Sequence, residues 1–304
     1  MRNNYRSFFW PAVLILIGVF ALLVNAGLVP VERLNRLVDL WPLILVVIGL
    51  EILVRRAFHG PAAELAALLV VLVAIVGAAT FVALGPAVPT GTQTLDTSGK
   101  VGSLDHATVT VEVGAANITM QGGGIGDDLY RAHIEYSGNK PDVSLDSSSG
   151  DLRISQGSSS GFFFFQNRRF VLNLQLNPSV QWKVTVDSGS AADTFNLPNI
   201  RVASIDINTG ASHEDITLGQ PSGTIPVTIN GGALTVNVHR PRGVAASAAV
   251  TGGAVNLNFD GRQSHAVGSA TDKTRDDDGA SDRYQIQVDG GASNVRVDTS
   301  APVG

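Results

Sequence analysis

The arrangement of hydrophobic positions along the chain changes near residue 88. Before that point there are three long apolar runs; after it, apolar and polar residues alternate, glycine recurs, and no long apolar run remains. Helices that cross a bilayer need roughly 20 apolar residues, whereas alternation with a period of two is typical of strands that bury one face. The pattern therefore predicts a membrane anchor followed by an all-β domain.

The apolar runs predict three α-helical transmembrane spans, at about residues 8–28, 38–54 and 62–84. The middle run is shorter than the other two and contains Glu51, which lies one helical turn before Arg55. This spacing predicts a neutralised pair near the lipid headgroups. We expect the anchor to occupy residues 1–84, a Pro-, Gly- and Thr-rich linker to occupy 85–99, and the β domain to occupy 100–304.

Two of the apolar runs begin with the same motif, a Trp-Pro pair followed by apolar residues and a glycine. The pairs are Trp10–Pro11 and Trp41–Pro42. Indole side chains prefer the membrane interface, and proline is tolerated in the first turn of a helix. We predict that these four residues anchor the starts of two related helices at the interface.

The arginines of the N-terminal region predict the orientation of the chain. Arg2 and Arg6 precede the first run, and Arg55 and Arg56 separate the second from the third. Since cytoplasmic loops carry the excess of basic residues, the N-terminus is expected inside and, after three spans, the β domain outside. A re-entrant second run would reverse this and leave the β domain in the cytosol.

A short unit recurs after the linker, in which two alternating apolar residues precede a glycine that is followed by Ala or Ser. The glycines of the six copies are Gly114, Gly189, Gly210, Gly232, Gly253 and Gly291. The four consecutive glycines from 189 to 253 are 21, 22 and 21 residues apart. A fixed period of this size predicts stacked units, and we expect a single-stranded right-handed β-helix or similar solenoid with strands about 4.8 Å apart.

A β-sandwich of hairpins is the alternative fold. We expect no hairpin with a two-residue Asn-Gly or Asp-Gly turn in the repeat, which favours the solenoid. The glycines are expected at tight corners without room for a side chain, with a positive φ as a further expectation. Residues 121–180 interrupt the period and are expected in less regular hairpins, and residues 262–282 in a polar insertion.

Four consecutive phenylalanines, Phe162, Phe163, Phe164 and Phe165, precede Arg168 and Arg169. One interpretation is a loop that caps an open end of the solenoid, because terminal repeats need a cover. The other is a hydrophobic tip that contacts the bilayer or a membrane partner, with the arginines on lipid phosphates.

Charge and composition exclude several functions. The net charge of −5 divides into +2 for residues 1–88 and −7 for the rest, and an acidic β domain argues against nucleic-acid binding. The absence of cysteine excludes disulfides, thiolate metal sites and thiol nucleophiles. The histidines are scattered without metal-site spacing, and no Gly-x-Ser-x-Gly elbow occurs.

Two acidic segments are candidate calcium sites. Gly123–Tyr130 fits a single calcium nonapeptide, and Asp276–Asp278 with Asp282 offers oxygen ligands. A single copy and the lack of EF-hand spacing predict a hairpin tip and a solvated loop instead. Asp206 and Glu214 are the nearest carboxylates expected on neighbouring rungs, but nothing in the sequence puts them in a cleft. We therefore predict no catalytic, cofactor or metal site.

The repeated motifs resemble a known family. The Trp-Pro-apolar-Gly hairpin resembles the transmembrane region shared by LiaI- and LiaF-type bacterial envelope-stress proteins. The segment Tyr284–Val297, with the earlier Gly-Ala-Ser and Gly-Gly-Ala units, resembles the toast-rack β domain of LiaF-type and adhesin-like proteins. This resemblance implies a β-solenoid on a membrane anchor and, for LiaF itself, inhibition of a sensor histidine kinase that answers cell-wall antibiotics.

The leading interpretation is a multi-pass membrane protein, not an enzyme, whose β domain senses or binds and modulates a cell-envelope stress response. Its expected partners are the lipid bilayer and a membrane histidine kinase or other envelope protein. A structural or adhesin-like surface module is the alternative. A carbohydrate-active β-helix enzyme is a third hypothesis, which aligned carboxylates in a groove would support.

Overall fold

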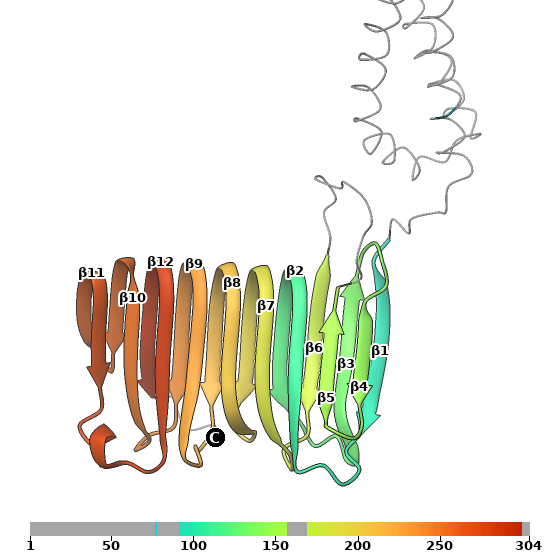
Figure 1. The fold of residues 1–304 in the computed structure, drawn as a ribbon, viewed down its shortest axis with the longest axis horizontal. Coiled ribbons are helices and arrows are strands. Elements are labelled where there is room, and N and C mark those ends of the chain that lie inside the picture. Colours follow the sequence, from blue (N-terminus) through green and yellow to red (C-terminus); the bar gives the residue numbers. More distant parts are fainter. Residues whose placement is uncertain (1–76, 78–90, 157–168, 300–304) are drawn as a thin grey trace, which may run out of the picture. The chain divides into compact units, whose positions relative to one another are not determined.

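The structure is a computed structural model that describes residues 77, 91–156 and 169–299. Residues 91–159 and 167–304 belong to one compact unit, whose described strands are shown in Figure 1. The predicted spans at 8–28, 38–54 and 62–84 lie outside the described residues except for Gly77. Among the described residues, no helix has the length and apolar character needed to cross a membrane.

Twelve strands and one short 3-10 helix make up the described part of the chain. They are β1 (Gln93–Lys100), β2 (His106–Gly122), β3 (Asp128–Tyr136), β4 (Asp142–Asp146), β5 (Asp151–Ser155), β6 (Phe170–Leu176), β7 (Gln181–Leu197), β8 (Arg201–Leu218), β9 (Thr224–Arg240), β10 (Ala245–Phe259), β11 (Arg262–Lys273), η2 (Asp277–Gly279) and β12 (Arg283–Thr299).

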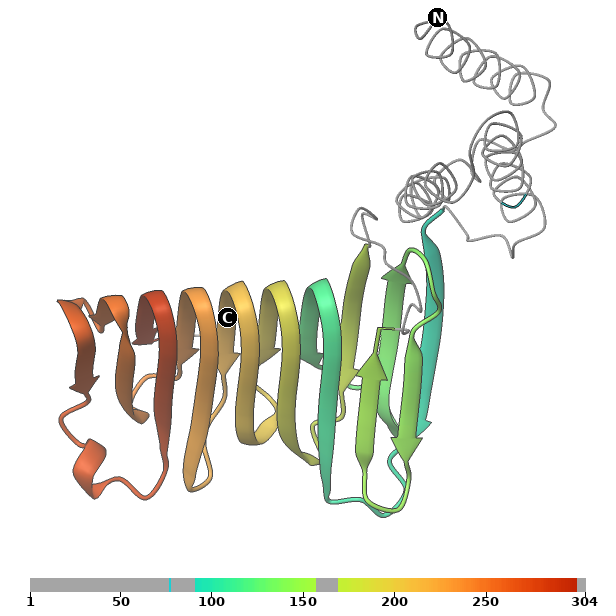
Figure 2. The same ribbon diagram turned by 45° about the horizontal axis from the view of Figure 1, so that its top comes forward.

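Each copy of the repeat forms one long strand that bends at its glycine, and we call such a bent strand a rung. In β7, Val184 and Val186 before the bend and Phe195 after it are fully buried, whereas Thr185 and Thr194 alternate with them and point outward. Because alternate side chains of a strand point to opposite faces, the two halves of the rung enclose one apolar core. Figure 2 shows these bent strands stacked along one axis.

Six rungs pair in parallel, in the order β2-β7-β8-β9-β12-β10 within the described sheet. The all-β domain with stacked units agrees with the predicted solenoid. The stacking order differs from the chain order, because β12 inserts between β9 and β10 (Figure 1). The register keeps equivalent positions side by side, so that Ala292 of β12 pairs with Ala233 on one side and Ala254 on the other.

The corner glycines stack on one another. A Cβ added at Gly232 would lie 2.8 Å from the carbonyl oxygen of Gly210, and one at Gly291 would lie 2.8 Å from that of Gly232. The expected positive φ is wrong, since none of the six corner glycines has a φ in the left-handed region. Glycine is needed there because the backbone of the neighbouring rung approaches closely.

The N-terminal end of the stack is completed by shorter strands. The first half of β2 pairs with β5, which pairs with β4, and its second half pairs with β6, which continues to β3 and β1. Residues 121–180 therefore contain the hairpin-like strands expected there. The expected linker 85–99 is corrected at its end, because residues 93–99 belong to β1 and pair with β3.

The opposite end is completed by β11, which pairs antiparallel with β10. Residues 262–273, expected in a polar insertion, thus form a strand instead. The hairpin uses a two-residue Asp260–Gly261 turn, and both residues have a positive φ, 48° and 82°. That geometry is typical of the Asp-Gly hairpin turn, so the expectation that no such turn occurs is wrong at this position.

Candidate functional site

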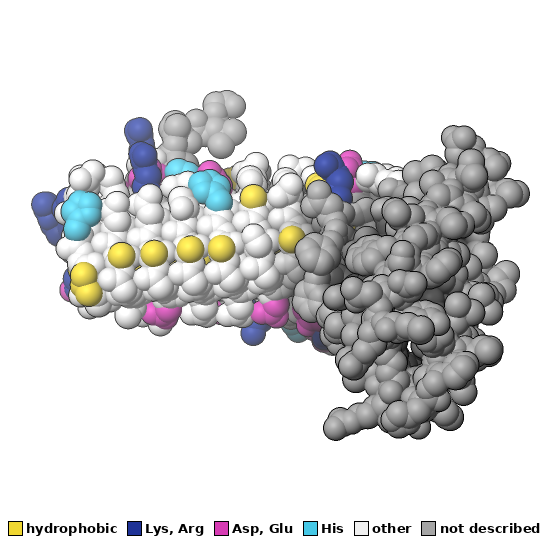
Figure 3. Space-filling model, turned by 90° about the horizontal axis from the view of Figure 1, so that it is seen from above, with side chains coloured by type: hydrophobic (Ala, Val, Ile, Leu, Met, Phe, Trp, Pro, Cys, Tyr) yellow, Lys and Arg dark blue, Asp and Glu magenta, His cyan; other side chains and the backbone are white. Residues whose placement is uncertain are grey.

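The outer surface at the corners of β9, β12, β10 and β11 presents a line of small apolar side chains. Ala233, Ala292 and Ala254 directly follow the corner glycines and are exposed. The line ends on β11 at Val267, which is 88% exposed and is the one large hydrophobic side chain exposed among the described residues. Figure 3 shows this row of hydrophobic atoms along the corner face.

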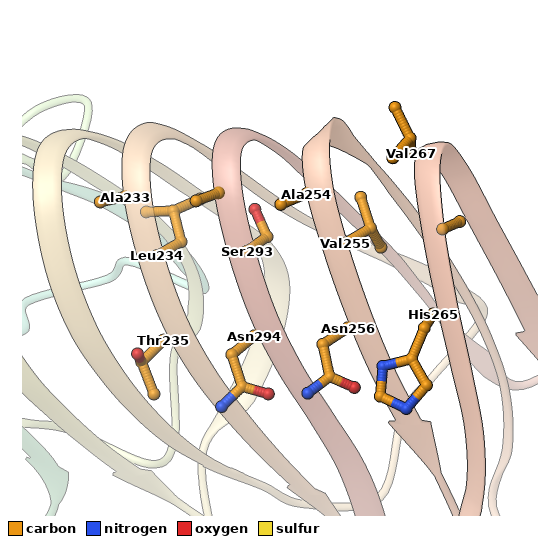
Figure 4. Close-up of a pocket in the computed structure, with 12 residues that line it drawn as sticks. Ala233, Leu234, Thr235, Ala254, Val255, Asn256, His265, Val267, Ser293 and Asn294 are labelled. Atoms are coloured by element: carbon orange, nitrogen blue, oxygen red, sulfur yellow. The ribbon is translucent and has the colours of Figure 1, made fainter.

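A polar row runs beside the apolar line, two residues after it on β9, β12 and β10 and two residues before it on the antiparallel β11. It consists of Thr235, Asn294, Asn256 and His265, which pair in register across β9, β12, β10 and β11. These residues point outward because they alternate with buried positions of the rungs. In Figure 4 their side chains lie side by side along the stack.

Between the two rows lies a groove of about 760 Å³. Its floor is formed by Leu234, Ser293 and Val255, which occupy one register position on β9, β12 and β10. Ser293 is the smallest of the three and the one polar residue at this position (Figure 4). The Ser293 hydroxyl is buried and has no hydrogen-bond partner among the described residues.

A second hollow of about 330 Å³ continues the polar surface and is lined by Asn237, Asn256, Asn258, Gln263, Asn294 and Arg296. Asn258 accepts a hydrogen bond from the Gly261 amide, and Arg296 donates to Asp298. No hydrogen bond of the described residues involves the side chains of Asn237, Asn256, Asn294 or Gln263. These amides are free to bind a ligand.

On the halves of the rungs that precede the bend, the outward polar side chains bond to one another. There Asn230 donates to Asn208 at 3.0 Å, and Asn208 donates to Asp187 at 2.8 Å, so the polar groups form a ladder along the stack. The groove side is therefore the face of the rungs where side-chain amides without hydrogen-bond partners among the described residues lie beside the apolar line. We call the surface formed by the apolar line, the polar row, the groove between them and the second hollow the corner groove.

The corner groove is suited to binding. His265 is the one titratable residue among those that line the main groove, and no carboxylate lines it. Since equivalent positions repeat about every 4.8 Å across paired strands, the free amides match an extended ligand that lies along the stack. The predicted carbohydrate-active enzyme would need aligned carboxylates in a groove, and this groove contains none.

Most residues of the other predicted sites lie outside the described residues. This applies to Trp10, Pro11, Trp41 and Pro42, to Phe162, Phe163, Phe164 and Phe165, and to Arg168. Arg169 is described: its guanidinium donates to Glu135 at 3.0 Å, and its amide donates to the Ser137 hydroxyl. The predicted corner glycines, from Gly114 to Gly291, all lie at the bends of the rungs.

The acidic segments considered for calcium are occupied by basic partners. Asp128 pairs with Lys100 and Arg131, each at 2.8 Å, and these cations hold the pKa of its carboxyl below the usual value. Asp278 pairs with Lys273 at 2.6 Å, while Asp282 accepts from the Gly223 amide. Within the described ranges, no group of three or more His, Asp or Glu residues is arranged to hold a metal ion.

The expected carboxylate pair is corrected by the register. Asp206 and Glu214 lie on the same rung, β8, and the neighbour of Glu214 on the adjacent rung is Asp193 of β7. Both Asp193 and Glu214 are buried in the core. Counting from the corner glycines would have found them, since each stands four residues after its glycine, where the other copies have apolar residues.

The comparisons with known proteins agree with this architecture. The N-terminal domain of toast_rack, DUF2154, matches residues 86–239, and the LiaF transmembrane domain matches residues 9–90. A candidate cell adhesion protein from Clostridium sporogenes ATCC 15579 superposes with a TM-score of 0.59 at 16% identity, over 69% of this chain and 100% of that one. At this identity the likeness concerns the fold alone.

A candidate adhesin from Parabacteroides merdae ATCC 43184 gives a TM-score of 0.31 at 9% identity, over 68% of this chain and 80% of that one. None of the curated proteins matches the chain. The toast_rack match spans half of the sequence and covers four of the six rungs, β2, β7, β8 and β9 up to His239, while the LiaF match covers the apolar N-terminal region. The chain therefore belongs to the toast-rack family, as a LiaF-like protein in which a LiaF-type transmembrane region precedes a toast-rack β domain.

Proposed function

We propose that this protein is a membrane-anchored, non-catalytic interaction module that modulates a cell-envelope stress response through a membrane partner such as a sensor histidine kinase. The observation that supports it is the order of the two family matches, with the LiaF transmembrane domain at 9–90 running directly into the toast-rack domain at 86–239. A β domain joined directly to a membrane region is tethered within reach of partners in the same membrane.

The corner groove is the surface that we assign to this interaction. Its free amides at Asn294 and Asn256 supply hydrogen bonds, and Ala292 and Val267 supply apolar contact. Interfaces combine such apolar contact with a polar surround. The β domain contacts its partner on the outer side of the membrane, following the distribution of arginines in the N-terminal region.

The groove can be tested with a pair of variants on one rung. Asn294 and Gln285 are both exposed residues of β12, but Gln285 lies on the half before the bend, away from the groove. Asn294→Arg should place a bulky charge in the groove and release the stress response in unstressed cells, to the level of a strain that lacks the protein. Gln285→Arg should behave like the wild type, and both variants should keep the wild-type Tm, because exposed substitutions change stability by about 0.5 kcal/mol or less.

The readout is a transcriptional reporter of envelope stress, with and without a cell-wall antibiotic. An unchanged reporter in the strain that lacks the protein would contradict the regulatory function itself. A changed reporter in that strain, with Asn294→Arg and Gln285→Arg both like the wild type, would contradict only the assignment of the groove.

A structural or adhesin-like surface module is the second candidate. The fold shared with the Clostridium sporogenes candidate cell adhesion protein supports it, since that chain is covered over its full length. The same deletion strain separates the two functions: loss of cell adhesion with an unchanged stress reporter favours the surface module.

A further inference from the structure

One register position in the core differs between rungs. Four residues after the corner glycine, the side chain points inward, and four of the six rungs have an apolar residue there. These residues are Ile118, Val236, Val295 and Leu257, exposed by 1% or less. The two remaining rungs, β7 and β8, have Asp193 and Glu214 at this position.

The two carboxyl groups are adjacent and isolated from water. Asp193 and Glu214 pair directly in the register of β7 and β8, and they are 1% and 0% exposed. None of their four carboxyl oxygens makes a hydrogen bond of 3.5 Å or less with a described residue, and neither does the buried hydroxyl of Ser212. The polar groups that act on the pair are the two carboxyls on each other, the Ser212 hydroxyl on Glu214 and the Ile118 backbone on Asp193.

Within the part of the chain that the structure describes, no cation forms an ion pair with either carboxyl group. The other titratable residues of β7, β8 and β9 near the pair occupy exposed or partly exposed positions, namely Lys183, Asp187, Asp206, His213, Asp215 and His239. On the flanking rungs, β2 has Asn117 and Thr119 beside the position, and β9 has Thr235 and Asn237. Arg240, which is buried, forms an ion pair with Asp260 beyond the end of β9.

We propose that Asp193 and Glu214 form a proton-binding site in the core of the β domain. An ionised carboxylate without a partner is costly to bury, and such groups take up a proton instead. The protonated pair fills the core as the apolar residues of the other rungs do. When the protons leave, two like charges face each other at about one strand spacing, and β7 and β8 loosen.

The electrostatics of the site agree with this geometry. Burial, followed by the neighbouring charge of Glu214, raises the pKa of Asp193 to about 8, and burial raises the pKa of Glu214 to about 7. Both values are above those of the unfolded chain, so the folded protein holds more protons between about pH 4 and about pH 8. Stability contributed by the site is therefore complete at acidic pH and is lost as the pH rises through this range.

This property belongs to the fold and does not depend on the partner proposed above. Its use as a signal does rest on the proposed function: a β domain outside the membrane would report the external pH to its partner. The experiment below measures the site in the purified protein, so its outcome is separate from that of the stress reporter.

The test uses the full-length protein in detergent, titrated from about pH 5 to about pH 9. Infrared difference spectra should show loss of the carbonyl band of protonated carboxyl groups. The hydrogen-exchange protection factors of the β7 and β8 peptides, which correct the rates for the intrinsic increase of amide exchange with pH, should fall at least tenfold. In Asp193→Asn with Glu214→Gln, both changes should disappear. Asp206→Asn, which removes an outward carboxylate of β8, should leave them intact.

A second double variant guards against misfolding of the first. Asp193→Ile with Glu214→Val introduces the residues found at this position in β2 and β9, and the protection factors of β7 and β8 should stay high in this variant up to about pH 9. The proposal is overturned if the wild type shows no pH-dependent carboxyl band, if that band persists in both double variants, or if the protection factors of β7 and β8 do not change with pH in the wild type.

Discussion

At the bend of five of the six rungs, the space that a Cβ would take is filled by a backbone carbonyl oxygen of the neighbouring rung. For Gly232 and Gly253, the nearest oxygens lie 2.8 and 3.0 Å from the ideal Cβ position. These oxygens belong to the backbone and cannot move without disturbing the strand pairing. A side chain at such a corner therefore has to separate two rungs.

Gly232→Val should lower the stability of the β domain by more than the ~1 kcal/mol of an ordinary change in strand propensity. The measurement is the Tm of a fragment that starts at Gly91, because β1 begins at Gln93. Gly124→Val is the matched control, since a Cβ at Gly124 meets no atom within 4 Å and its φ is not in the left-handed region. Equal Tm values for the two variants would contradict the steric role of the corner.

The sequence predicts the corner glycines because the interval between strand and glycine is constant. It does not reveal why glycine is needed, since the clash comes from another rung and not from the local φ. The free amides of Asn294 and Asn256 were missed for a similar reason. Only the stacking of β12 against β10 brings them together.

At the scale of the strands, the last copy of the repeat is the one whose place could not be predicted. The period identifies residues 283–299 as a rung, but it does not say which neighbours this rung takes. The Asp260–Gly261 turn returns the chain antiparallel as β11, which occupies the outer edge of β10. The inner edge of β10 is then paired with β12, which also pairs with β9.

Because β12 pairs with β9 on one side and β10 on the other, removing it should leave both of these rungs without a neighbour. A chain that ends at Asp282 is expected to lose cooperative unfolding and to be cleaved rapidly by protease in β10 and β11, since unpaired strand edges are exposed. A chain that ends at Thr299 keeps all of β12 and serves as the control. Equal protease resistance of the two chains would show that β10 and β11 do not need β12.

At the scale of the whole molecule, the apolar N-terminal region and the β domain together define a membrane protein of the LiaF-like type. The apolar runs predict membrane association because helices of that length and composition are unstable in water. The side on which the β domain lies depends on the second run, since one re-entrant segment reverses the topology. The expected outer location of the β domain rests on a small difference in arginine content between the loops.

The absence of cysteine allows the side to be measured directly. Single cysteines at Thr92 and Ser269, both exposed in the β domain, should react with a membrane-impermeant maleimide in intact cells, after permeabilisation of an outer membrane where there is one. A cysteine at Asn3, before the first predicted span, should react only after lysis, because an N-terminus inside is expected from Arg2 and Arg6. Protection of Thr92 and Ser269 until lysis would place the β domain in the cytosol. The corner groove and the buried carboxyl pair would then face the interior of the cell, and neither an external ligand nor the external pH could reach them.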